Sequence, residues 1–436
     1  MELFKKSKKN IDIDKNTKDT NEKHDNIIEE GIKTVKFSVS TMLTIVMTIV
    51  LSVCILVMVW LTAHIIIFGN LLEEYRSSQG DLSGLTQVMA EIQHHYDSMY
   101  IGDKNELDFV DKALAGFTYA QNDKYGYYLS PSDSKDKNDE YIESLVGIGV
   151  HVVNESDLGW YVSRVIENSP AKDAGIIKGD YIVEVNGESF RNFDDPNEFI
   201  NRIKGISKST VNIGINRNGE IIRIDVIRRE VQNKSVIYNI IKNDIAYIKI
   251  TSFTSYTDEE FKASVEEMKK SGIDKFIIDL RDNTGGAAET VIDMCDYMLP
   301  EGLIARFEYV DKTVEYNSKP DEAEGNFVIL VNELTASASE LFTRTLQEYG
   351  KAKVVGVKTF GKGTVITTII LSNGGTLTLS SAKYYTKSGI QLEGNGVDPD
   401  YVVELSIEDK KILYKLPIDE DEQLLKAIEV VNNMSK

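Results

Sequence analysis

The chain has 436 residues, of which 42% are hydrophobic and 27% are charged, and its formal net charge is −20 at pH 7. The length predicts two or three domains, since one domain usually takes about 100–200 residues, and the composition excludes disorder over most of the chain. The strong negative charge argues against nucleic acid as a partner, because phosphate binding needs a basic surface. Cys54 and Cys295 are the only cysteines, and Cys54 lies in an apolar run, so no intrachain disulfide is expected.

The first 69 residues predict a tail followed by a membrane span. Residues 1–38 mix charges of both signs without apolar periodicity, which predicts a disordered cytoplasmic tail. From Met42 to Phe68 the chain is apolar except for Thr, Ser and His64, and this run exceeds the roughly 20 residues that a bilayer-spanning helix needs. Residues 39–69 are therefore predicted to form a single transmembrane helix.

Two further points concern this predicted span. A cleaved signal peptide is the alternative, but its apolar stretch is usually about 7–15 residues, and no small-residue cleavage site follows here. Several lysines precede the span, whereas only Arg76 closely follows it. The positive-inside rule thus places the N-terminus in the cytoplasm and everything after about Asn70 on the outer side of the cell membrane.

Residues 80–145 are predicted to form a small helical subdomain. Their apolar residues recur at helical spacing, as seen in Leu85, Val88, Met89, Ile92 and Tyr96 and again in Phe109, Leu114 and Phe117. The polar, turn-rich stretch from Ser130 to Tyr141 is predicted to be a loop or linker.

Residues 146–230 predict a partly open β-barrel of five short strands and two short helices. The segment begins with Gly147-Ile148-Gly149-Val150. Glycines in such a loop let successive backbone N–H groups approach a peptide carboxylate with no Cβ in the way. A Gly-x-Gly pair alone could be a plain turn. Together with the later motifs SPA, AG, GD and NG, however, the segment resembles a circularly permuted PDZ domain, which implies a carboxylate-binding role for this loop.

Residues 231–436 alternate strands with helices. AYIKITSF precedes the helical DEEFKASVEEMKKSG, KFIIDL precedes AAETVIDMCDYML, and NFVILV precedes ASELFTRTLQEYG. Three such repeats with buried strands predict an α/β layered fold. The doubly wound nucleotide-binding type is not expected, because no G-x-G-x-x-G follows a strand. The later runs KVVGV, TVITTIIL and GTLTLSSAKYY predict further strands.

Two loops at the C-terminal ends of these strands are candidates for chemistry, since α/β sheets place their sites there. In LRDNTGG, the pair Gly285-Gly286 lets backbone N–H groups approach a ligand, as an oxyanion hole requires, although a tight turn is the simpler interpretation. In TASASE, Ser337 opens a helix, where the next backbone N–H can stabilise an oxyanion. Ser337 and Glu340 also have the spacing of a capping box, so a purely structural cap stays open.

A third loop, Thr359 to Thr364, holds Lys362 between two glycines. A serine nucleophile needs a base, and none of the five histidines lies in residues 231–436. A lysine can serve if desolvation lowers its pKa until it is neutral, although an ordinary surface lysine is the alternative. Residues 356–362 also match the start of a P-loop, but Gly363 replaces the required Ser or Thr and a strand-like run follows, which argues against nucleotide binding.

The motifs LRDNTGG, TASASELFTRTLQEYG, VVGVKTFGKGTV, GGTLTLSSAKYYTKSG and GNGVDPD stand in the order found in carboxyl-terminal processing peptidases, the tail-specific proteases. The chain resembles this family from about Leu82 to Val431. The resemblance implies an α/β fold in which a crotonase-like protease core, residues 231–436, carries the PDZ domain as an insertion after the helical subdomain.

The resemblance also implies roles for individual residues. It identifies Ser337 as the nucleophile, with Ser339 as the rival within the same motif, and Lys362 as the general base. The implied oxyanion donors are the backbone N–H of Ala338 and that of Gly285 or Gly286. No metal and no cofactor is implied.

One position departs from the family pattern. Many members carry a glutamine four residues after the lysine, where it helps to orient the base, but this chain has Ile366. Either the enzyme works as a bare Ser-Lys dyad, with Ile366 helping to desolvate the lysine, or it is a catalytically impaired pseudoprotease that serves as a peptide-binding scaffold.

The implied function is therefore that of a membrane-anchored serine endopeptidase. It would hydrolyse peptide bonds near the C-termini of protein substrates through an acyl-enzyme. The expected partners are protein or peptide C-terminal tails, which the PDZ domain would bind or use to gate the site, with room for an activating protein partner.

Overall fold

The computed structural model describes residues 44, 47–63, 82–102, 106–134, 144–155, 157–232, 234–320 and 323–434. The chain divides into two compact units, Met1–Lys104 and Asn105–Lys436. The first unit holds a helix over residues 47–63 and α2 (Leu82–Met99). Within the described ranges, no helix combines the length and the apolar character needed to cross a membrane. The tail predicted at residues 1–38 and both ends of the span predicted at 39–69 lie outside the described residues.

The second unit begins with α3 (Glu106–Tyr119) and β1 (Tyr127–Leu129). The helices predicted from apolar spacing are thus present as α2 and α3, one in each unit. The loop predicted from Ser130 is wrong over residues 131–134, which are helical. The reason is local, because the N–H of Asp133 donates to Ser130 Oγ at 3.2 Å and caps this turn. Most of the remaining predicted linker lies outside the described residues.

A small β-barrel covers residues 144–232. Its antiparallel six-stranded sheet has the order β3-β4-β5-β7-β8 with β6 paired to β5, and β2 pairs with β9. The strands are β2 (Ser144–Gly147), β3 (Val150–Glu155), β4 (Gly159–Val165), β5 (Tyr181–Val185), β6 (Glu188–Ser189), β7 (Thr210–Arg217), β8 (Glu220–Ile227) and β9 (Arg229–Gln232).

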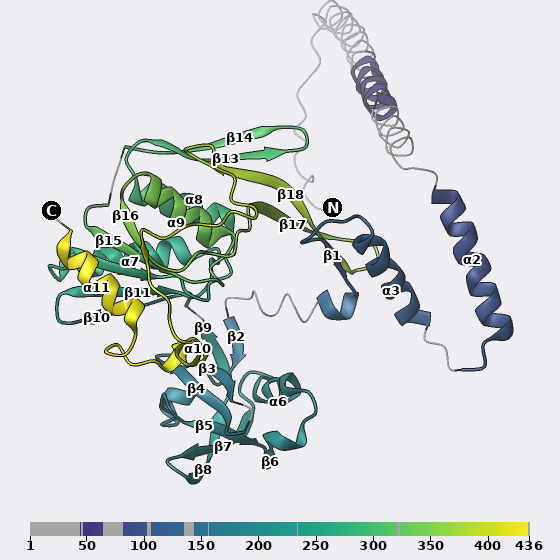
Figure 1. Cartoon of the computed structure of the whole chain (residues 1–436). Helices are drawn as coiled ribbons and strands as arrows, with labels where there is room; N and C mark the ends of the chain where they lie inside the picture. The colour runs from purple at the N-terminus through teal and green to yellow at the C-terminus, as the bar shows by residue number, and fades with distance from the viewer. Residues whose placement is uncertain are drawn as a thin grey trace, which may run out of the picture. The chain divides into compact units, whose positions relative to one another are not determined.

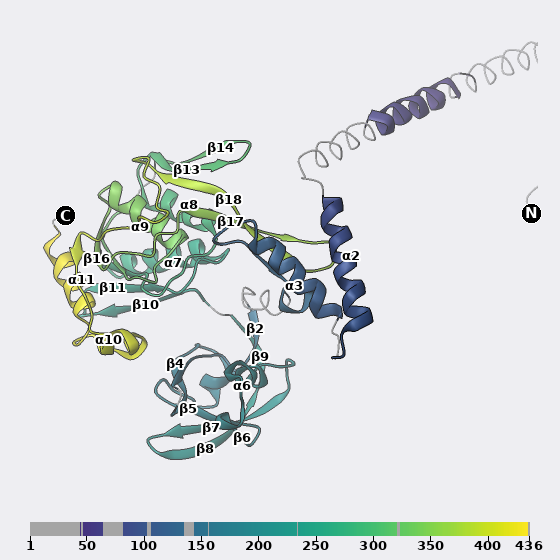
Figure 2. The same ribbon diagram turned by 45° about the vertical axis from the view of Figure 1, so that its right-hand side comes forward.

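The barrel core forms around one helix. The chain connects the strands through α5 (Pro170–Asp173), η1 (Phe190–Asn192) and α6 (Pro196–Ile203). Phe199 and Ile203 of α6 are buried against strand residues such as Val162 and Ile182, and α6 lies against the curled strands in Figure 2. The five strands and two helices predicted for this region are present as β3, β4, β5, β7 and β8 with α5 and α6, and β2, β6, β9 and η1 are additional to the prediction.

The main sheet of residues 231–436 has six strands in the order β10-β11-β12-β15-β16-β19 and is parallel except for the β10–β11 pair. Its strands are β10 (Val236–Ile241), β11 (Ile245–Ile250), β12 (Lys275–Asp279), β15 (Asn326–Val331), β16 (Ala352–Gly356) and β19 (Tyr401–Val402). The central strands read as continuous apolar runs because helices cover both faces. The predicted α/β layered fold is confirmed.

Three helices pack on one face of this sheet and one on the other (Figure 1). The first face carries α7 (Thr257–Lys270), α8 (Ala288–Met298) and α9 (Ala338–Glu348), and the second carries α11 (Glu422–Asn433). Two short elements, α10 (Ile407–Lys411) and η2 (Leu413–Lys415), precede α11.

A second, antiparallel sheet of five strands has the order β1-β18-β13-β14, with β17 also paired to β18. Its strands after β1 are β13 (Gly302–Tyr309), β14 (Thr313–Ser318), β17 (Thr364–Ile370) and β18 (Thr376–Thr386). Because β17 directly follows the Lys362 loop, the helix that a P-loop requires is not found there, and the P-loop interpretation is excluded.

Candidate active site

Ser337 occupies the sharp turn between β15 and α9. Its φ of 58° and ψ of −121° lie in a region that non-glycine residues avoid. Such backbone strain costs about 1–3 kcal/mol and is concentrated at functional sites. In α/β hydrolases a strained strand-to-helix turn of this kind exposes the nucleophilic serine. Ser337 is half-buried between the buried residues Ala336 and Ala338, so the turn presents this one residue.

Ser339, the rival in the same motif, is placed differently. It is completely buried, and its Oγ donates to the carbonyl oxygen of Asn283 at 3.0 Å. A hydroxyl that is buried and hydrogen-bonded to the backbone is not accessible to a substrate. The geometry therefore favours Ser337 over Ser339 as nucleophile.

The loop after β12 lies directly against the Ser337 turn. A Cβ added to Gly285 would lie 2.9 Å from Ser337 Cβ and 3.0 Å from the backbone nitrogen of Ala338. Gly285 and Gly286 also have φ values of 105° and 145°, which L side chains rarely adopt. Only glycine thus allows the two loops to approach so closely.

The three predicted oxyanion donors are not equivalent. The N–H of Gly285 already donates to Asn283 Oδ1 at 2.9 Å. The N–H groups of Gly286 and Ala338, by contrast, make no hydrogen bond to any residue in the described part of the chain. Ala338 is the first residue of α9, where the N–H has no partner within the helix. Gly286 and Ala338 therefore fit the oxyanion role better than Gly285.

A cavity of about 190 Å³ lies beside Ser337. Ser337, Gly286 and Tyr309 line it, together with Ile366 from β17. The side chain of Ile366 is 40% exposed, and the cavity has room for a side chain of a bound peptide. Lys362 is not among its lining residues, so the base would approach Ser337 from outside this cavity.

Lys362 is a desolvated cation. Its Nζ lies 4.7 Å from the centroid of the Tyr125 ring, and its ammonium makes no hydrogen bond or ion pair with any described residue. Burial lowers the pKa of Lys362 below the ordinary value of 10.5, and the nearby Tyr127 and three carboxylates oppose this shift only in part. A lysine that loses its proton more easily is what a general base requires.

The Tyr125 ring is held over Lys362 by its own contacts. The Tyr125 hydroxyl donates to Glu393 Oε1 at 2.8 Å, and Glu393 Oε2 accepts the N–H of Gly363 at 2.9 Å. Asp123, in the same loop as Tyr125, accepts the N–H of Ser380 at 2.6 Å. Sequence reasoning missed Tyr125, because no local pattern links it to a loop so distant in the chain.

Glu340 joins the serine loop to the lysine loop. Its Oε2 accepts the N–H groups of Ser337 and Lys362, each at 2.8 Å. Its Oε1 accepts the N–H of Gly361 at 2.7 Å and the hydroxyl of Thr359. Glu340 is completely buried, and this burial raises the pKa of the carboxyl although the four donors oppose the shift.

The capping-box interpretation of Ser337 and Glu340 is therefore correct but incomplete, and it does not conflict with a catalytic role for Ser337. Glu340 does accept the Ser337 N–H as in a capping box, but the same carboxylate also fixes the lysine loop. The buried hydroxyl of Tyr384 makes a second connection, since it lies within hydrogen-bond distance of the carbonyl oxygens of Ser337, at 3.1 Å, and Lys362. The structure thus brings together the two loops that the sequence singled out.

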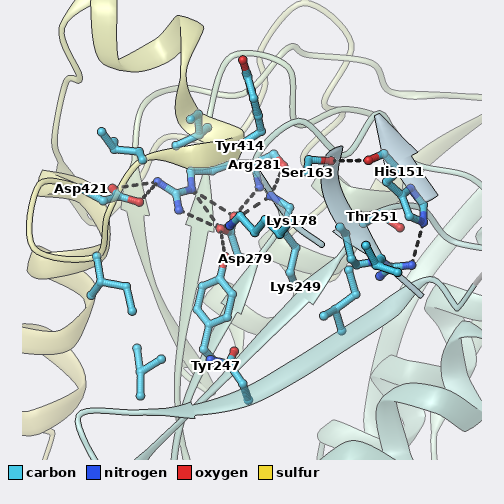
Figure 3. A pocket seen from close by; sticks show the side chains of 18 of the residues that line it. His151, Ser163, Lys178, Tyr247, Lys249, Thr251, Asp279, Arg281, Tyr414 and Asp421 are labelled. Carbon is cyan, nitrogen blue, oxygen red and sulfur yellow. Dashed lines mark hydrogen bonds and ion pairs between the residues drawn. The ribbon is translucent and has the colours of Figure 1, made fainter. Parts of the chain in front are cut away.

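A second buried cation lies near the start of the Gly285 loop. Arg281 makes 2.8 Å ion pairs with both Asp279 and Asp421, and Tyr247 donates to Asp279 at 2.5 Å (Figure 3). Burial alone would raise the pKa of Asp279, but Arg281 and Lys249 hold it well below its usual range. All charges in this cluster are paired, which suits a structural support for the loop.

The predicted carboxylate loop of the barrel connects β2 to β3. Gly149 has a φ of 82°, and a Cβ there would lie 2.3 Å from Ser169 Cβ. The N–H groups of Ile148 and Gly149 donate to no residue in the described ranges. Gly147, Ile148, Gly149 and Val150 line a cavity of about 190 Å³ with Ile200 and Ile203 of α6. The four predicted residues thus face a groove beside a helix, as a peptide site requires.

Comparison with known proteins gives the family. Residues 244–403 match Peptidase family S41 and residues 138–216 match the PDZ domain. The "Carboxy-terminal-processing protease" of Bartonella bacilliformis is 30% identical over 335 residues, which cover 74% of this chain and 76% of that protein. The "Probable CtpA-like serine protease" of Staphylococcus aureus strain MRSA252 is 30% identical over 366 residues, 83% of this chain and 71% of that protein.

A solved structure is similar in fold. It is that of an S41-type protease from Bacteroides fragilis, with a TM-score of 0.53 and 19% identity, covering 78% of this chain and 93% of that one. The resemblance seen in the sequence is therefore confirmed. The chain belongs to peptidase family S41, the carboxy-terminal-processing serine proteases, and carries a PDZ domain.

Proposed function

We propose that this protein is a membrane-anchored serine endopeptidase that cleaves protein substrates near their C-termini, with Ser337 as nucleophile and Lys362 as general base. The observation that carries this proposal is the pairing of a strained, half-buried serine with a desolvated lysine through one buried carboxylate, Glu340. Neither feature is expected in a turn or a surface loop with no chemical role.

We propose the following reaction for these residues. Neutral Lys362 takes the proton of Ser337 Oγ as the oxygen attacks the scissile carbonyl carbon. The N–H groups of Ala338 and Gly286 then donate to the oxyanion of the tetrahedral intermediate. The Lys362 ammonium returns the proton to the leaving amine, and a water activated by the same lysine releases the acyl group from Ser337.

We also infer that the base is oriented without a glutamine. Ile366 cannot donate or accept a hydrogen bond, and it lines the cavity beside Ser337. The Lys362 backbone is instead held by Glu340, and its ammonium lies over the Tyr125 ring. A dyad with this support is favoured over a pseudoprotease, because a pure scaffold has no use for the strain at Ser337 or the desolvation of Lys362.

The direct test is cleavage of an unstructured protein such as β-casein by the full-length chain. Ser337→Ala and Lys362→Ala are each expected to lower the rate by at least about 10³-fold, since each removes a reacting group. Equal cleavage by all three proteins would overturn the mechanism. No cleavage by any of them, even with added membrane extract as a source of an activating partner, would favour the scaffold.

The membrane anchor is part of the same proposal. It is supported by the apolar run from Met42 to Phe68 and by the lysines that precede it. We propose that residues 39–69 cross the cell membrane once, with the protease outside and the PDZ loop receiving the substrate tail. External protease added to intact spheroplasts should digest the chain after about residue 70 and spare the N-terminal tail. Recovery of the protein in the soluble fraction after alkaline carbonate extraction would contradict the anchor.

A further inference from the structure

One hydroxyl in the wall of the cavity beside Ser337 has no hydrogen-bond partner. Thr364, the first residue of β17, lines this cavity, and its Oγ1 is buried without a partner among the described residues. Four buried side-chain atoms in the described part of the chain lack a partner, and the other three belong to residues outside this lining. A buried polar atom without a partner is unfavourable, so a hydrogen bond formed during the reaction would stabilise it.

Thr364 shares one side of its strand with Lys362. The pairing of β17 with β18 continues to Gly363, whose carbonyl oxygen accepts the N–H of Tyr384 at 3.1 Å. Side chains alternate between two faces along such a segment, so residues 362 and 364 lie on the face opposite to residue 363. The face of Gly363 is filled, because a Cβ there would lie 2.2 Å from the backbone nitrogen of Glu393. The face that Lys362 and Thr364 share is therefore the one that borders the Ser337 cavity.

A lysine that acts as the base for Ser337 needs an acceptor for its own protons. The neutral amine takes the serine proton through its single lone pair, and that lone pair has to face Ser337 Oγ at hydrogen-bond distance. The ammonium formed in this step carries three donors and no acceptor. Because the lysine stem is flexible, a hydrogen bond to a second group is needed to fix the direction of the lone pair.

The other polar groups around Lys362 are already engaged. Glu340 accepts four hydrogen bonds, which fill the lone pairs of its carboxylate. Glu393 accepts three hydrogen bonds and lies outside the cavity lining. Thr367 does line the cavity, but its Oγ1 donates to a serine hydroxyl of β18 at 2.7 Å. Thr364 is thus the threonine of the lining whose hydroxyl is still available.

We propose that Thr364 is a positioning residue for the base: its Oγ1 accepts a hydrogen bond from Lys362 Nζ while that nitrogen takes the proton of Ser337 Oγ. The hydrogen bond directs the amine lone pair toward the serine and then stabilises the ammonium, and Thr364 keeps its own proton throughout. Ile366 lines the same cavity and cannot hydrogen-bond, so the polar contact of β17 comes from residue 364 instead. The inference rests on the proposed function, because it takes Lys362 as the base.

The test is the rate at which a fluorophosphonate probe labels Ser337 in the full-length protein. Ser337 Oγ attacks the phosphorus and displaces fluoride, a step that needs the base but no peptide substrate. Thr364→Val keeps the shape of the side chain and removes the hydroxyl. It is expected to slow labelling at neutral pH at least about tenfold, since misplacing a reacting group by about 1 Å can cost about 10²-fold. Thr364→Ser keeps the hydroxyl and should stay within about threefold of the parent.

The pH profile of labelling separates positioning from a merely structural role. A hydrogen-bond acceptor favours the charged form of a lysine, so its loss should lower the pKa of Lys362 and move the acid limb to lower pH. A loop that only loosened would admit water to the ammonium and move the limb the other way. The titratable groups that act on this pKa stay in place in Thr364→Val, namely Tyr127, Glu393, Glu340 and Asp123.

Two further variants control the test. Thr368→Val removes another hydroxyl of β17, but this one is already paired with Thr378 at 3.0 Å and lies outside the cavity lining. Its labelling rate and pH profile should match those of the parent. The double variant Thr364→Val with Ile366→Gln places an amide oxygen in the same lining and should label at least about fivefold faster than Thr364→Val alone.

Two outcomes would overturn the role of Thr364 alone. The first is a Thr364→Val protein with the rate and the pH profile of the parent, and the second is a Thr364→Ser protein as slow as Thr364→Val. Thr364→Ala takes the place of the valine variant if that protein fails to fold. Labelling of the parent that is no faster than that of Ser337→Ala would overturn the Ser-Lys mechanism itself, and this role with it.

Discussion

Arg281 and Lys362 are two cations that follow parallel strands of one sheet, and their surroundings are opposite. Arg281 is fully buried between Asp279 and Asp421. Lys362 has an aromatic ring over its ammonium and no ion pair within the described residues. A cation with two carboxylates keeps its proton and fixes the backbone around it, whereas a desolvated cation without an anion can give its proton up. In the proposed mechanism, the choice of partner thus separates a structural charge from a reactive one.

Lys362→Arg is expected to have the largest effect on peptide hydrolysis. Arginine keeps the positive charge and much of the side-chain volume, but it cannot be deprotonated in a protein. We expect kcat/KM for peptide hydrolysis to fall by about 10³-fold or more, since a general base typically contributes 10²–10⁴-fold. Thermal unfolding of the variant should match that of the parent. Activity above a tenth of the parent level would mean that Lys362 acts only as a charge.

Arg281→Met tests the structural side. It leaves Asp279 and Asp421 buried without their cation, so we expect the free energy of unfolding at pH 7 to fall by about 3–5 kcal/mol in urea titrations. Arg223→Met, at an exposed pair, should leave the free energy of unfolding close to that of the parent. An equal cost for the two variants would remove the distinction between the clusters.

The same variant has a predictable pH dependence. The pKa of Asp279 is held down in the folded parent, so its stabilising effect is present above the unfolded pKa of about 3.9 and is lost as the pH falls toward the folded value. Without Arg281 the carboxyl binds a proton more easily. The stability difference between parent and Arg281→Met should therefore shrink on going from pH 7 to pH 4.

Tyr125→Ala keeps Lys362 and removes only the aromatic ring that lies over its ammonium. Loss of the ring admits water to the ammonium, and because desolvation is the dominant influence there, the pKa of Lys362 should rise toward 10.5. The neutral fraction of the base then falls, so the acid limb of the kcat/KM profile moves to higher pH, with about a tenfold loss at pH 7 for each pKa unit. Tyr125→Phe keeps the ring and should shift the limb less. A profile unchanged in Tyr125→Ala would show that the ring does not set this pKa.

Ser339→Ala is expected to have the smallest effect. Like Arg281, Ser339 is already engaged, through its hydrogen bond to the carbonyl of Asn283, so its loss should cost about 1–2 kcal/mol of stability. Cleavage of β-casein should stay within about threefold of the parent. A loss as large as that of Ser337→Ala would instead transfer the nucleophile role to Ser339.

The sequence predicted what depends on local pattern. The strand-helix repeats, the barrel strands and the loops that carry Ser337 and Lys362 all follow from periodicity, from glycine spacing and from the lack of histidine after residue 231. Helix α11 was not predicted, although Leu424, Ala427 and Val430 have helical apolar spacing. The loop prediction at 131–134 is wrong because the side chain of Ser130 caps a helical turn there.

Other features of the site depend on contacts between distant segments, and no local pattern encodes them. Tyr125 lies in the loop before β1 and Lys362 in the loop before β17, which is far along the chain, and only folding brings the ring over the ammonium. The contact of Glu340 with the backbone of Lys362 could not be predicted, because the spacing from Ser337 to Glu340 is already explained by a capping box. The positive φ of Ser337 is likewise a backbone property that the residue type does not reveal.

Because one carboxylate binds the backbone of both Ser337 and Lys362, the two residues cannot be displaced independently. A movement that pulls the lysine loop away withdraws a hydrogen bond from the turn that strains the serine, and the converse also holds. Partial disorder at one loop is therefore expected to disturb the other, so that the two residues would respond together. If Ser337 and Lys362 are the catalytic pair, a partner that moves only one of the two loops would lower activity through both residues.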